Sequence, residues 1–245
     1  MHQKKRQNER RLNSMAKKTK MNKDARNLIT VTQPKSPVAE QYRAIRTNIE
    51  FMAVDKEIQV ILITSATQGE GKSTTASNLA VAYAQQGKKV LVIDTDMRRP
   101  TVHYTFRVAN GLGLSSLLTR QSNLEKVVLE TKVENLSILT AGPIPPNPAE
   151  LLSSKSMEQL TLQLRRQYDV IVMDAPPLLQ VADSRITSKL TDGVVLVVGC
   201  TTSDRQRVLK AKEQLELAEA KILGVVLNRR ELTDDSAYQY YYSYE

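Results

Sequence analysis

The chain has 245 residues, a formal net charge of +9 and a single cysteine. This length suits one α/β domain with tails and is enough to bury a substantial core. One cysteine excludes intrachain disulfides and cysteine-rich metal sites, and we expect Cys200 to be a small core residue beside a strand. No apolar stretch is long enough to span a membrane and the N-terminus lacks a signal-peptide core, so we expect a cytoplasmic protein.

Most of the positive charge lies at the N-terminus, where residues 1–26 contain ten Lys or Arg and only two acidic residues. We expect residues 1–35 to form a basic flexible arm. Such an arm is either a solvated tail or a segment attracted to anionic lipid or to an acidic partner. Nucleic acid is not an expected partner, because no recognised DNA- or RNA-binding motif accompanies the charge.

A helix is predicted over residues 38–52, after two prolines that mark a linker. Glu40, Arg43 and Arg46 are spaced three residues apart, so their side chains form one stripe on which Glu and Arg can pair within the helix. The stripe is either solvated surface or a set of fixed charges that docks onto another subunit.

The strongest motif follows a short apolar strand predicted at residues 60–63. Residues 66–73 read Ala-Thr-Gln-Gly-Glu-Gly-Lys-Ser and match the Walker A pattern G-x-x-x-x-G-K-[ST], except that alanine replaces the first glycine. Gly69 and Gly71 let the backbone amides turn inward, at the N-terminus of a helix that closes near Gly87. Ordinary turn glycines are the alternative, but the strand before the loop and the helix after it favour nucleotide binding.

Each position of this loop has an expected role. Lys72 is expected to contact the β- and γ-phosphates and the Ser73 hydroxyl to bind Mg²⁺. Thr74 begins the helix, where it contributes either to the nucleotide site or to helix surface and packing. The predicted nucleotide-binding residues of the loop are Gly69, Glu70, Gly71, Lys72, Ser73 and Thr74.

Two further strands are predicted to end in carboxylates. The strand at residues 89–93 is followed by Asp94 and Asp96, whose side chains point to the same side of an extended segment. The strand at residues 170–173 is followed by Asp174, as in a Walker B motif, where a buried strand carries one carboxylate to Mg²⁺. In doubly wound sheets this edge is where ligands bind. The alternatives are a capping role for the first two carboxylates and a structural role for the third.

The remaining elements continue the alternation of strands and helices. We expect short helices at 114–118 and 123–130, a strand at 136–140, an irregular proline-rich loop at 142–148, a helix at 156–167, a strand at 194–198, a helix at 204–220 and a strand at 222–227. This alternation predicts an α/β fold of the P-loop NTPase type, with a doubly wound, mainly parallel sheet and helices on both faces, in a domain at residues 36–230.

Residues 231–245 differ in character from the rest of the chain. They contain four acidic residues, no Lys or Arg, and five of the nine tyrosines, namely Tyr238, Tyr240, Tyr241, Tyr242 and Tyr244. We interpret the segment as a mobile tail after the last core strand. Since the chain has no Trp and only two Phe, this concentration of tyrosines indicates a substrate and not general aromatic richness.

Together these motifs resemble those of the bacterial protein-tyrosine kinases (BY-kinases), in particular the stand-alone cytosolic type of Gram-positive bacteria that regulates capsular or exopolysaccharide synthesis. The resemblance covers about residues 36–245. It rests on the Walker A loop, on hydrophobic residues followed by D-x-D-x-R at 92–98, on hydrophobic residues followed by D-x-x-P at 170–177, on E-x-x-R-x-x-R at 40–46, and on the tyrosine tail. Five motifs in order are more specific than any one of them.

The resemblance implies ATP- and Mg²⁺-dependent transfer of the γ-phosphoryl group to tyrosine hydroxyls, with the tail as the main acceptor. It implies that Ser73 binds Mg²⁺ directly and that Asp96 and Asp174 bind it directly or through water. Asp94 is the expected residue for orienting and deprotonating the tyrosine, although the roles of Asp94 and Asp96 are interchangeable at this stage. Lys72 completes the expected catalytic set, together with Arg98, which contacts the acceptor or braces these carboxylates.

Other features follow from the resemblance with less support from the residues themselves. Asn228, after the last strand, stands where relatives contact adenine. The stripe Glu40, Arg43 and Arg46 is implied to join copies in a closed, head-to-tail ring, an octamer in the family, in which a tail is phosphorylated by the neighbouring subunit. Implied partners are a transmembrane activator or chain-length regulator of polysaccharide synthesis, which recruits the chain to the inner face of the membrane, and a phosphotyrosine phosphatase.

Two other functions remain open at this stage. One is a P-loop ATPase of the partition or septum-positioning type. Those relatives carry a signature lysine four positions before the last glycine of the loop, where this chain has Thr67, and they lack a tyrosine tail. The other is a nucleotide-switched scaffold without kinase activity, whose tyrosines only bind partners.

Overall fold

The computed structural model describes residues 28–52 and 57–230. The predicted basic segment up to residue 27 and the tail at residues 231–245, with its five tyrosines, lie outside the described residues.

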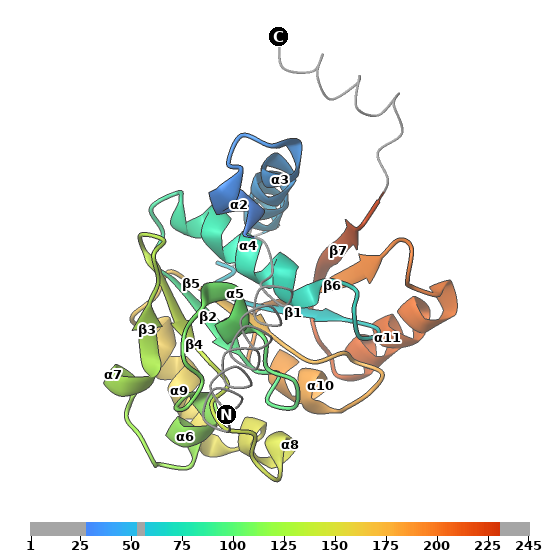
Figure 1. Cartoon of the computed structure of the whole chain (residues 1–245). Coiled ribbons are helices and arrows are strands. Elements are labelled where there is room, and N and C mark those ends of the chain that lie inside the picture. Colours follow the sequence, from blue (N-terminus) through green and yellow to red (C-terminus); the bar gives the residue numbers. More distant parts are fainter. Residues whose placement is uncertain (1–27, 53–56, 231–245) are drawn as a thin grey trace, which may run out of the picture.

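Seven strands form one sheet in the order β3-β4-β2-β5-β1-β6-β7 (Figure 1). The strands are β1 (Val60–Ser65), β2 (Val90–Asp94), β3 (Val128–Glu130), β4 (Leu136–Leu139), β5 (Val170–Asp174), β6 (Gly193–Gly199) and β7 (Ile222–Asn228). Every neighbouring pair is parallel except β3 and β4. The predicted mainly parallel α/β fold is therefore confirmed.

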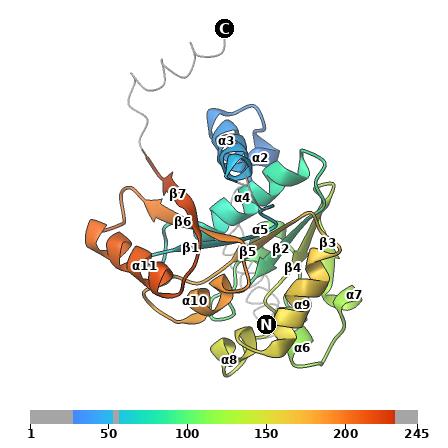
Figure 2. The ribbon, with the colours of Figure 1, turned by 180° about the vertical axis from the view of Figure 1, so that it is seen from behind.

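Helices cover both faces of this sheet, as Figures 1 and 2 show from opposite sides. On one face lie α2 (Ile29–Thr32), α3 (Pro37–Phe51), α4 (Lys72–Ala84) and α5 (Val102–Phe106), and on the other lie α6 (Leu114–Leu118), α7 (Leu124–Val127), α8 (Pro148–Leu152), α9 (Lys155–Arg165), α10 (Asp183–Ser188) and α11 (Arg205–Leu217). Parallel strands bury both faces and hence consist of nearly continuous apolar residues. The runs VILITS of β1 and VIVMD of β5 are accordingly buried at every position.

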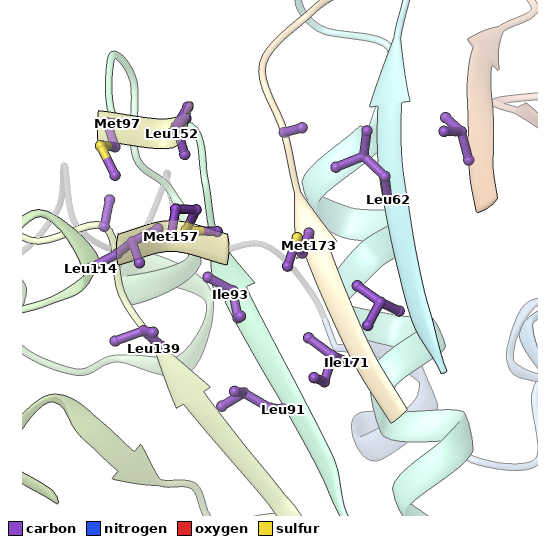
Figure 3. Packing of buried hydrophobic residues seen from close by; sticks show 14 of the residues in the cluster. Leu62, Leu91, Ile93, Met97, Leu114, Leu139, Leu152, Met157, Ile171 and Met173 are labelled. Atoms are coloured by element: carbon purple, nitrogen blue, oxygen red, sulfur yellow. The ribbon is translucent and has the colours of Figure 1, made fainter. Parts of the chain in front are cut away.

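The larger hydrophobic core lies between the sheet and helices α8, α9 and α11. Leu62, Ile93 and Ile171 project from three neighbouring strands towards Leu152 and Met157 of the helix layer (Figure 3). All five side chains are at most 1% exposed. Full burial of one such side chain stabilises the fold by about 1.5–3 kcal/mol, so this layer fixes the positions of the central strands.

The start of the folded body differs from the prediction. Residues up to 35 were expected to form one flexible arm, but α2 lies inside that range and packs on α4. Thr30 is fully buried, and its N–H and hydroxyl donate to Asn78 Oδ1 at 3.1 and 2.9 Å. The short apolar-polar sequence of α2 carries no helical period, so the contact that orders it could not be read from the sequence.

Two local predictions are wrong. The helix expected at 123–130 ends at Val127, and the three residues that follow pair with β4 as the antiparallel strand β3. Cys200 is exposed and not in the core, because it lies one residue beyond β6 in a turn, with its N–H donating to the Asn228 carbonyl. The strand itself was expected at residues 194–198 and spans Gly193–Gly199.

A half-buried ion pair closes the amino edge of the sheet. Gln59 N–H and Val60 N–H donate to Asp192 Oδ2 at 3.0 and 2.8 Å, and the Arg165 guanidinium donates to both carboxylate oxygens of Asp192 at 2.7 and 3.0 Å. Burial of Asp192 opposes its charge, but Arg165 and the two amides outweigh burial and lower the pKa of this carboxyl.

This pair predicts a pH-dependent contribution to stability. Asp192→Asn should lower the free energy of unfolding at pH 7 by about 1.5–3 kcal/mol, the usual contribution of hydrogen bonds to a charged group. Since the pKa is lowered on folding, the contribution is present above the usual value of 3.8 and is lost as the pH falls through the folded pKa. Urea unfolding at pH 7 and pH 3 measures the difference. An equal loss at both pH values would contradict the assignment, and Glu216→Gln on the exposed face of α11 serves as the control.

Candidate functional site

One pocket collects the predicted motifs at the carboxyl edge of the parallel strands. Its lining residues come from the loop after β1, the segment after β2, the segment after β5 and the residue after β7, and they are Gln68, Gly69, Gly71, Lys72, Ser73, Thr74, Asp96, Arg98, Arg99, Thr101, Pro176, Pro177, Gln180, Val181 and Arg229. The edge predicted for ligand binding is therefore the edge where the pocket lies.

The loop after β1 takes the conformation that its glycines allow. Gly69 and Gly71 have φ values of +88° and +99°, in the left-handed region that side chains disfavour. Gly71 is the N-cap of α4, so the first amides of that helix face the pocket. An added Cβ at Gly71 would lie 1.9 Å from Asn228 Nδ2, and this amide donates to the Glu70 carbonyl at 2.9 Å.

Asn228 and Glu70 hold the loop from its outer side. Neither residue lines the pocket. The fully buried Glu70 carboxylate accepts the Thr67 hydroxyl at 2.7 Å and the Ala66 N–H at 3.2 Å, which closes the loop on itself. The expected contact of Asn228 with adenine stays a prediction, whereas its contact with the loop backbone is a finding.

The charged centre of the site is the Lys72 ammonium. Its Nζ lies 2.9 Å from Asp96 Oδ2, 3.5 Å from Asp174 Oδ1 and 3.4 Å from Ser73 Oγ. The side chains of Lys72, Asp96 and Asp174 are only 10%, 5% and 0% exposed. Burial opposes the charged ammonium, but Asp174 and Asp96 outweigh it and raise the pKa of Lys72. Lys72 is therefore a buried cation shared by the carboxylates of two motifs.

The same oxygens fit Mg²⁺. Three hard oxygen donors, from Ser73, Asp96 and Asp174, surround one cation, the Lys72 ammonium, in this structure. Within residues 28–52 and 57–230, no three His, Cys, Asp or Glu side chains gather closely enough to hold a metal by themselves. Mg²⁺ is commonly bound by one or two carboxylates together with phosphate oxygens and water, so this donor set suits a metal that arrives with a nucleotide.

Asp94 lies below the pocket and not in its lining. It is fully buried, and the N–H groups of Asp96, Thr101 and Val102 donate to its two oxygens at 3.1, 2.9 and 3.0 Å. Burial, together with the nearby negative charge of Asp174, raises the pKa of Asp94 to about 7. The hydrogen bonds from Val102 and Thr101 act in the opposite direction but do not outweigh burial. The contacts of Asp94 are therefore those of the capping role considered as an alternative from the sequence. Of Asp94 and Asp96, only Asp96 lines the pocket.

Backbone contacts join the two carboxylate segments. Asp94 and Asp174 are directly paired residues of the neighbouring strands β2 and β5. Beyond the strands, the N–H and the hydroxyl of Thr95 both donate to the Asp174 carbonyl at 2.9 Å. The positions of Asp96 and Asp174 relative to each other are thus fixed by the sheet and by one threonine.

The sequence predictions missed several pocket residues. Arg98 was predicted either to contact the acceptor or to brace the site carboxylates. Its ion pair is with Asp183, which no motif singled out, and its contact with the acceptor stays a prediction. Arg99 donates to Gln68 Oε1 at 2.5 Å, and Arg229 lines the pocket from the end of β7. Arg99 follows a recognised motif directly and could have been inferred from it. Asp183 is 85 residues from its partner and has no local signal.

The stripe on α3 is partly used inside the chain. Arg43 donates to Glu40 Oε2 at 2.6 Å and to the Pro34 carbonyl at 2.7 Å. Arg46 donates to the Ala82 carbonyl at 2.9 Å and so satisfies the C-terminal turn of α4, on which α3 lies (Figure 1). The side chain of Glu40 is 50% exposed, so only the outer part of the stripe presents charge to solvent.

The close packing at Gly71 predicts a selective effect on nucleotide binding. Gly71→Ala should reduce the affinity for ATP at least about 100-fold, because the new Cβ displaces Asn228 and with it the loop amides. Gly87→Ala is the matched control, since Gly87 has a similar φ of +89° but open space around an added Cβ. Both variants should lose about 1–2 kcal/mol of stability to backbone strain. Calorimetric titration with ATP would contradict this account if both variants bound equally well.

Comparison with known proteins agrees with the site. A family model described as an AAA domain matches residues 58–219. The chain is 50% identical over 216 residues to tyrosine-protein kinase YwqD of Bacillus subtilis (strain 168), covering 88% of this chain and 91% of that protein. It is 43% identical over 210 residues to the putative tyrosine-protein kinase CapB of Staphylococcus aureus, covering 86% and 92%. The crystal structure of the chimerical protein CapA2B2 superimposes with a TM-score of 0.82 and 48% identity, over 84% of this chain and 90% of that one.

Septum-positioning proteins, the alternative considered from the sequence, are more distant. The septum site-determining protein MinD from Pyrococcus horikoshii, in complex with Mg-ADP, matches with a TM-score of 0.60 and 26% identity over 74% of this chain and 76% of that one. It shares the P-loop NTPase fold with this chain. In the described part of the chain, no helix has the length and apolar character needed to cross a membrane. By sequence, structure and site, the chain belongs to the bacterial tyrosine-protein kinase family.

Proposed function

We propose that this chain transfers the γ-phosphoryl group of ATP to tyrosines of its own C-terminal tail, mainly between subunits, and thereby regulates the synthesis and export of a capsular or extracellular polysaccharide. The observation that carries the proposal is the contact of Lys72 with Asp96 and Asp174 in a pocket below a Walker A loop. Phosphoryl transfer needs positioning and charge neutralisation, and both requirements suit this arrangement.

Different residues of the chain bind the phosphates and the metal. The loop amides at Gly69 and Gly71 face the phosphates, and Lys72 turns from the carboxylates to the β- and γ-phosphate oxygens. Ser73, Asp96 and Asp174 would hold Mg²⁺, which would neutralise charge on the phosphates.

The acceptor side completes the reaction. The tyrosine oxygen forms a bond to the γ-phosphorus as the bond to the β-phosphate oxygen breaks, and ADP leaves. The phenolic proton passes to the carboxylate pair Asp94 and Asp96, of which Asp96 is the member that lines the pocket. Asp94, with its pKa near 7, is able to hold a proton at neutral pH.

The described part of the chain ends near its own pocket, since Arg229 lines that pocket. Fifteen extended residues span about 50 Å, so length alone permits transfer within one chain as well as to a neighbour. A closed ring of subunits favours transfer to the neighbour, since it places a second pocket at a fixed distance. Each added phosphate brings a charge of about −1.5 to −2, so repulsion among fully modified acidic tails would loosen such a ring.

Partners complete the proposed regulation. A transmembrane activator would bring the chain to the inner face of the membrane, and a phosphotyrosine phosphatase would reset the tails. These proposals follow from the resemblance of the motifs to those of BY-kinases, and the outer, exposed part of α3 is the surface we assign to contact between copies.

Transfer between subunits is tested by mixing two variant chains, neither of which can phosphorylate its own tail. Lys72→Met provides a chain with an intact tail and a disabled phosphate site, and a chain with all five tail tyrosines replaced by Phe provides an intact site without acceptors. With ATP and Mg²⁺, phosphotyrosine should appear on the Lys72→Met chain only in the mixture, and at least about 100-fold less on that chain alone. Lys212→Met on α11 is the control for loss of a lysine.

Four other results would count against the proposal. Tail phosphotyrosine on the Lys72→Met chain alone would show that the phosphate site is wrongly assigned. Phosphotyrosine on the wild type but not in the mixture would show transfer within one chain. Release of free phosphate without phosphotyrosine would favour the partition-type ATPase, and neither product would favour the nucleotide-switched scaffold.

The oligomer is tested at the outer end of the stripe. Glu40→Ala with Arg43→Ala removes one exposed pair, which contributes about 0.3–0.5 kcal/mol, and the exposed hydrogen bond from Arg43 to the Pro34 carbonyl, which contributes about 0.5 kcal/mol. Tm should therefore change by no more than about 4 °C while light scattering shows monomers. Arg46 is left intact because its loss would also free the Ala82 carbonyl of α4. Lys212→Ala with Glu216→Ala, another exposed helical pair, is the matched control. An unchanged mass would leave the stripe as ordinary surface.

A further inference from the structure

A buried carboxylate outside all recognised motifs holds an arginine at the pocket. Arg98 lines the pocket, and its Nε and Nη2 donate to Asp183 Oδ2 and Oδ1 at 2.8 and 3.1 Å. The Asp183 side chain is 0% exposed, whereas that of Arg98 is 42% exposed. One edge of the guanidinium is thus bound to a buried anchor while the residue remains open to the pocket.

The anchor is itself firmly placed. Asp183 is the first residue of α10, and its carbonyl accepts the Thr187 hydroxyl at 2.8 Å. The next residue, Ser184, donates its hydroxyl to the Pro176 carbonyl, and Thr64 of β1 donates to the same carbonyl at 2.8 Å. The start of α10 is therefore tied to the segment that follows Asp174, and Asp183 has a fixed position relative to the site.

Stability alone gives no reason for an ion pair here. An apolar side chain of similar volume at position 183 would often be no less stabilising, because burial removes the hydration of the Asp183 carboxylate while the Arg98 side chain stays 42% exposed. A bidentate pair does fix the orientation of a guanidinium, since two parallel hydrogen bonds define its plane. The geometry that this pair fixes lies on the wall of the same pocket that Lys72, Ser73 and Asp96 line.

We propose that Asp183 is a positioning residue that orients Arg98 towards the incoming acceptor segment. The partner chemistry is an acidic, tyrosine-containing peptide. Two observations support it: the tail has four acidic residues and no Lys or Arg, and the pocket carries two further arginines, Arg99 and Arg229, besides Arg98. Arg98 keeps its Nη1 donors for that peptide while Asp183 occupies the opposite edge of the guanidinium. The inference rests on the proposed tyrosine transfer.

The test uses the full-length pair of chains described above. The enzyme is the chain whose five tail tyrosines are replaced by Phe, and the acceptor is the Lys72→Met chain. Asp183→Asn in the enzyme should raise the KM for the acceptor chain at least tenfold and leave the KM for ATP within twofold. Arg98→Ala should do the same. In a chain that already carries Arg98→Ala, Asp183→Asn should change the acceptor KM by less than twofold, because its effect passes through Arg98.

A matched variant separates positioning from stability. Asp192→Asn removes another bidentate arginine pair, with Arg165, at the opposite edge of the sheet. It should lower Tm comparably to Asp183→Asn but leave both KM values within twofold. Equal loss of ATP and acceptor affinity in Asp183→Asn, or independent multiplication of the Asp183 and Arg98 effects, would overturn the inference. If the parent enzyme itself phosphorylates no acceptor, the proposed function fails first.

Discussion

The site depends on one buried cation held between two carboxylates. Lys72 reaches Asp96 and Asp174 because β1, β2 and β5 are neighbours in a parallel sheet and end at the same edge. When Lys72 turns to a phosphate, as we propose, the buried carboxylates lose its positive charge. Buried charge without a partner is strongly unfavourable. Binding of phosphate to Lys72 and binding of a metal cation to Asp96 and Asp174 are therefore linked. This linkage explains why the donor set fits a metal that arrives with a nucleotide.

The rigidity of that edge comes from contacts that bear no charge. Thr95 ties the segment after β2 to the Asp174 carbonyl, and Asn228 ties the phosphate loop to the end of β7. Gly71 permits the second contact because no side chain stands between the loop and Asn228. Preorganised donors are effective in phosphoryl transfer because they need no rearrangement at the moment of reaction. These uncharged hydrogen bonds thus fix the positions from which the charged residues contact a nucleotide.

The sequence predicted the sheet and the central residues well, for physical reasons. Continuous apolar runs such as those of β1 and β5 have few alternatives to burial between helix layers, and a strand-loop-helix motif fixes where Lys72 and Ser73 lie. Prediction failed where a contact joins distant parts of the chain. Thr30 is ordered by Asn78, and Arg98 is held by Asp183, yet neither partner is marked by local periodicity. Asp94 shows the same limit within a motif, since its amide partners come from the following turn and helix.

The charged residues of the stripe on α3 differ in exposure and in their contacts. From their spacing in the sequence, Glu40, Arg43 and Arg46 would be equally exposed, but in the fold their exposures differ. Arg46 is 16% exposed and binds the last turn of α4, the helix whose first turn carries Lys72, whereas Glu40 is half exposed. A helix transmits displacement along its axis because its backbone hydrogen bonds run from end to end. If copies do contact each other at the outer end of α3, as we propose, that contact would bear on α4, the helix that follows the nucleotide loop, and would link assembly to catalysis.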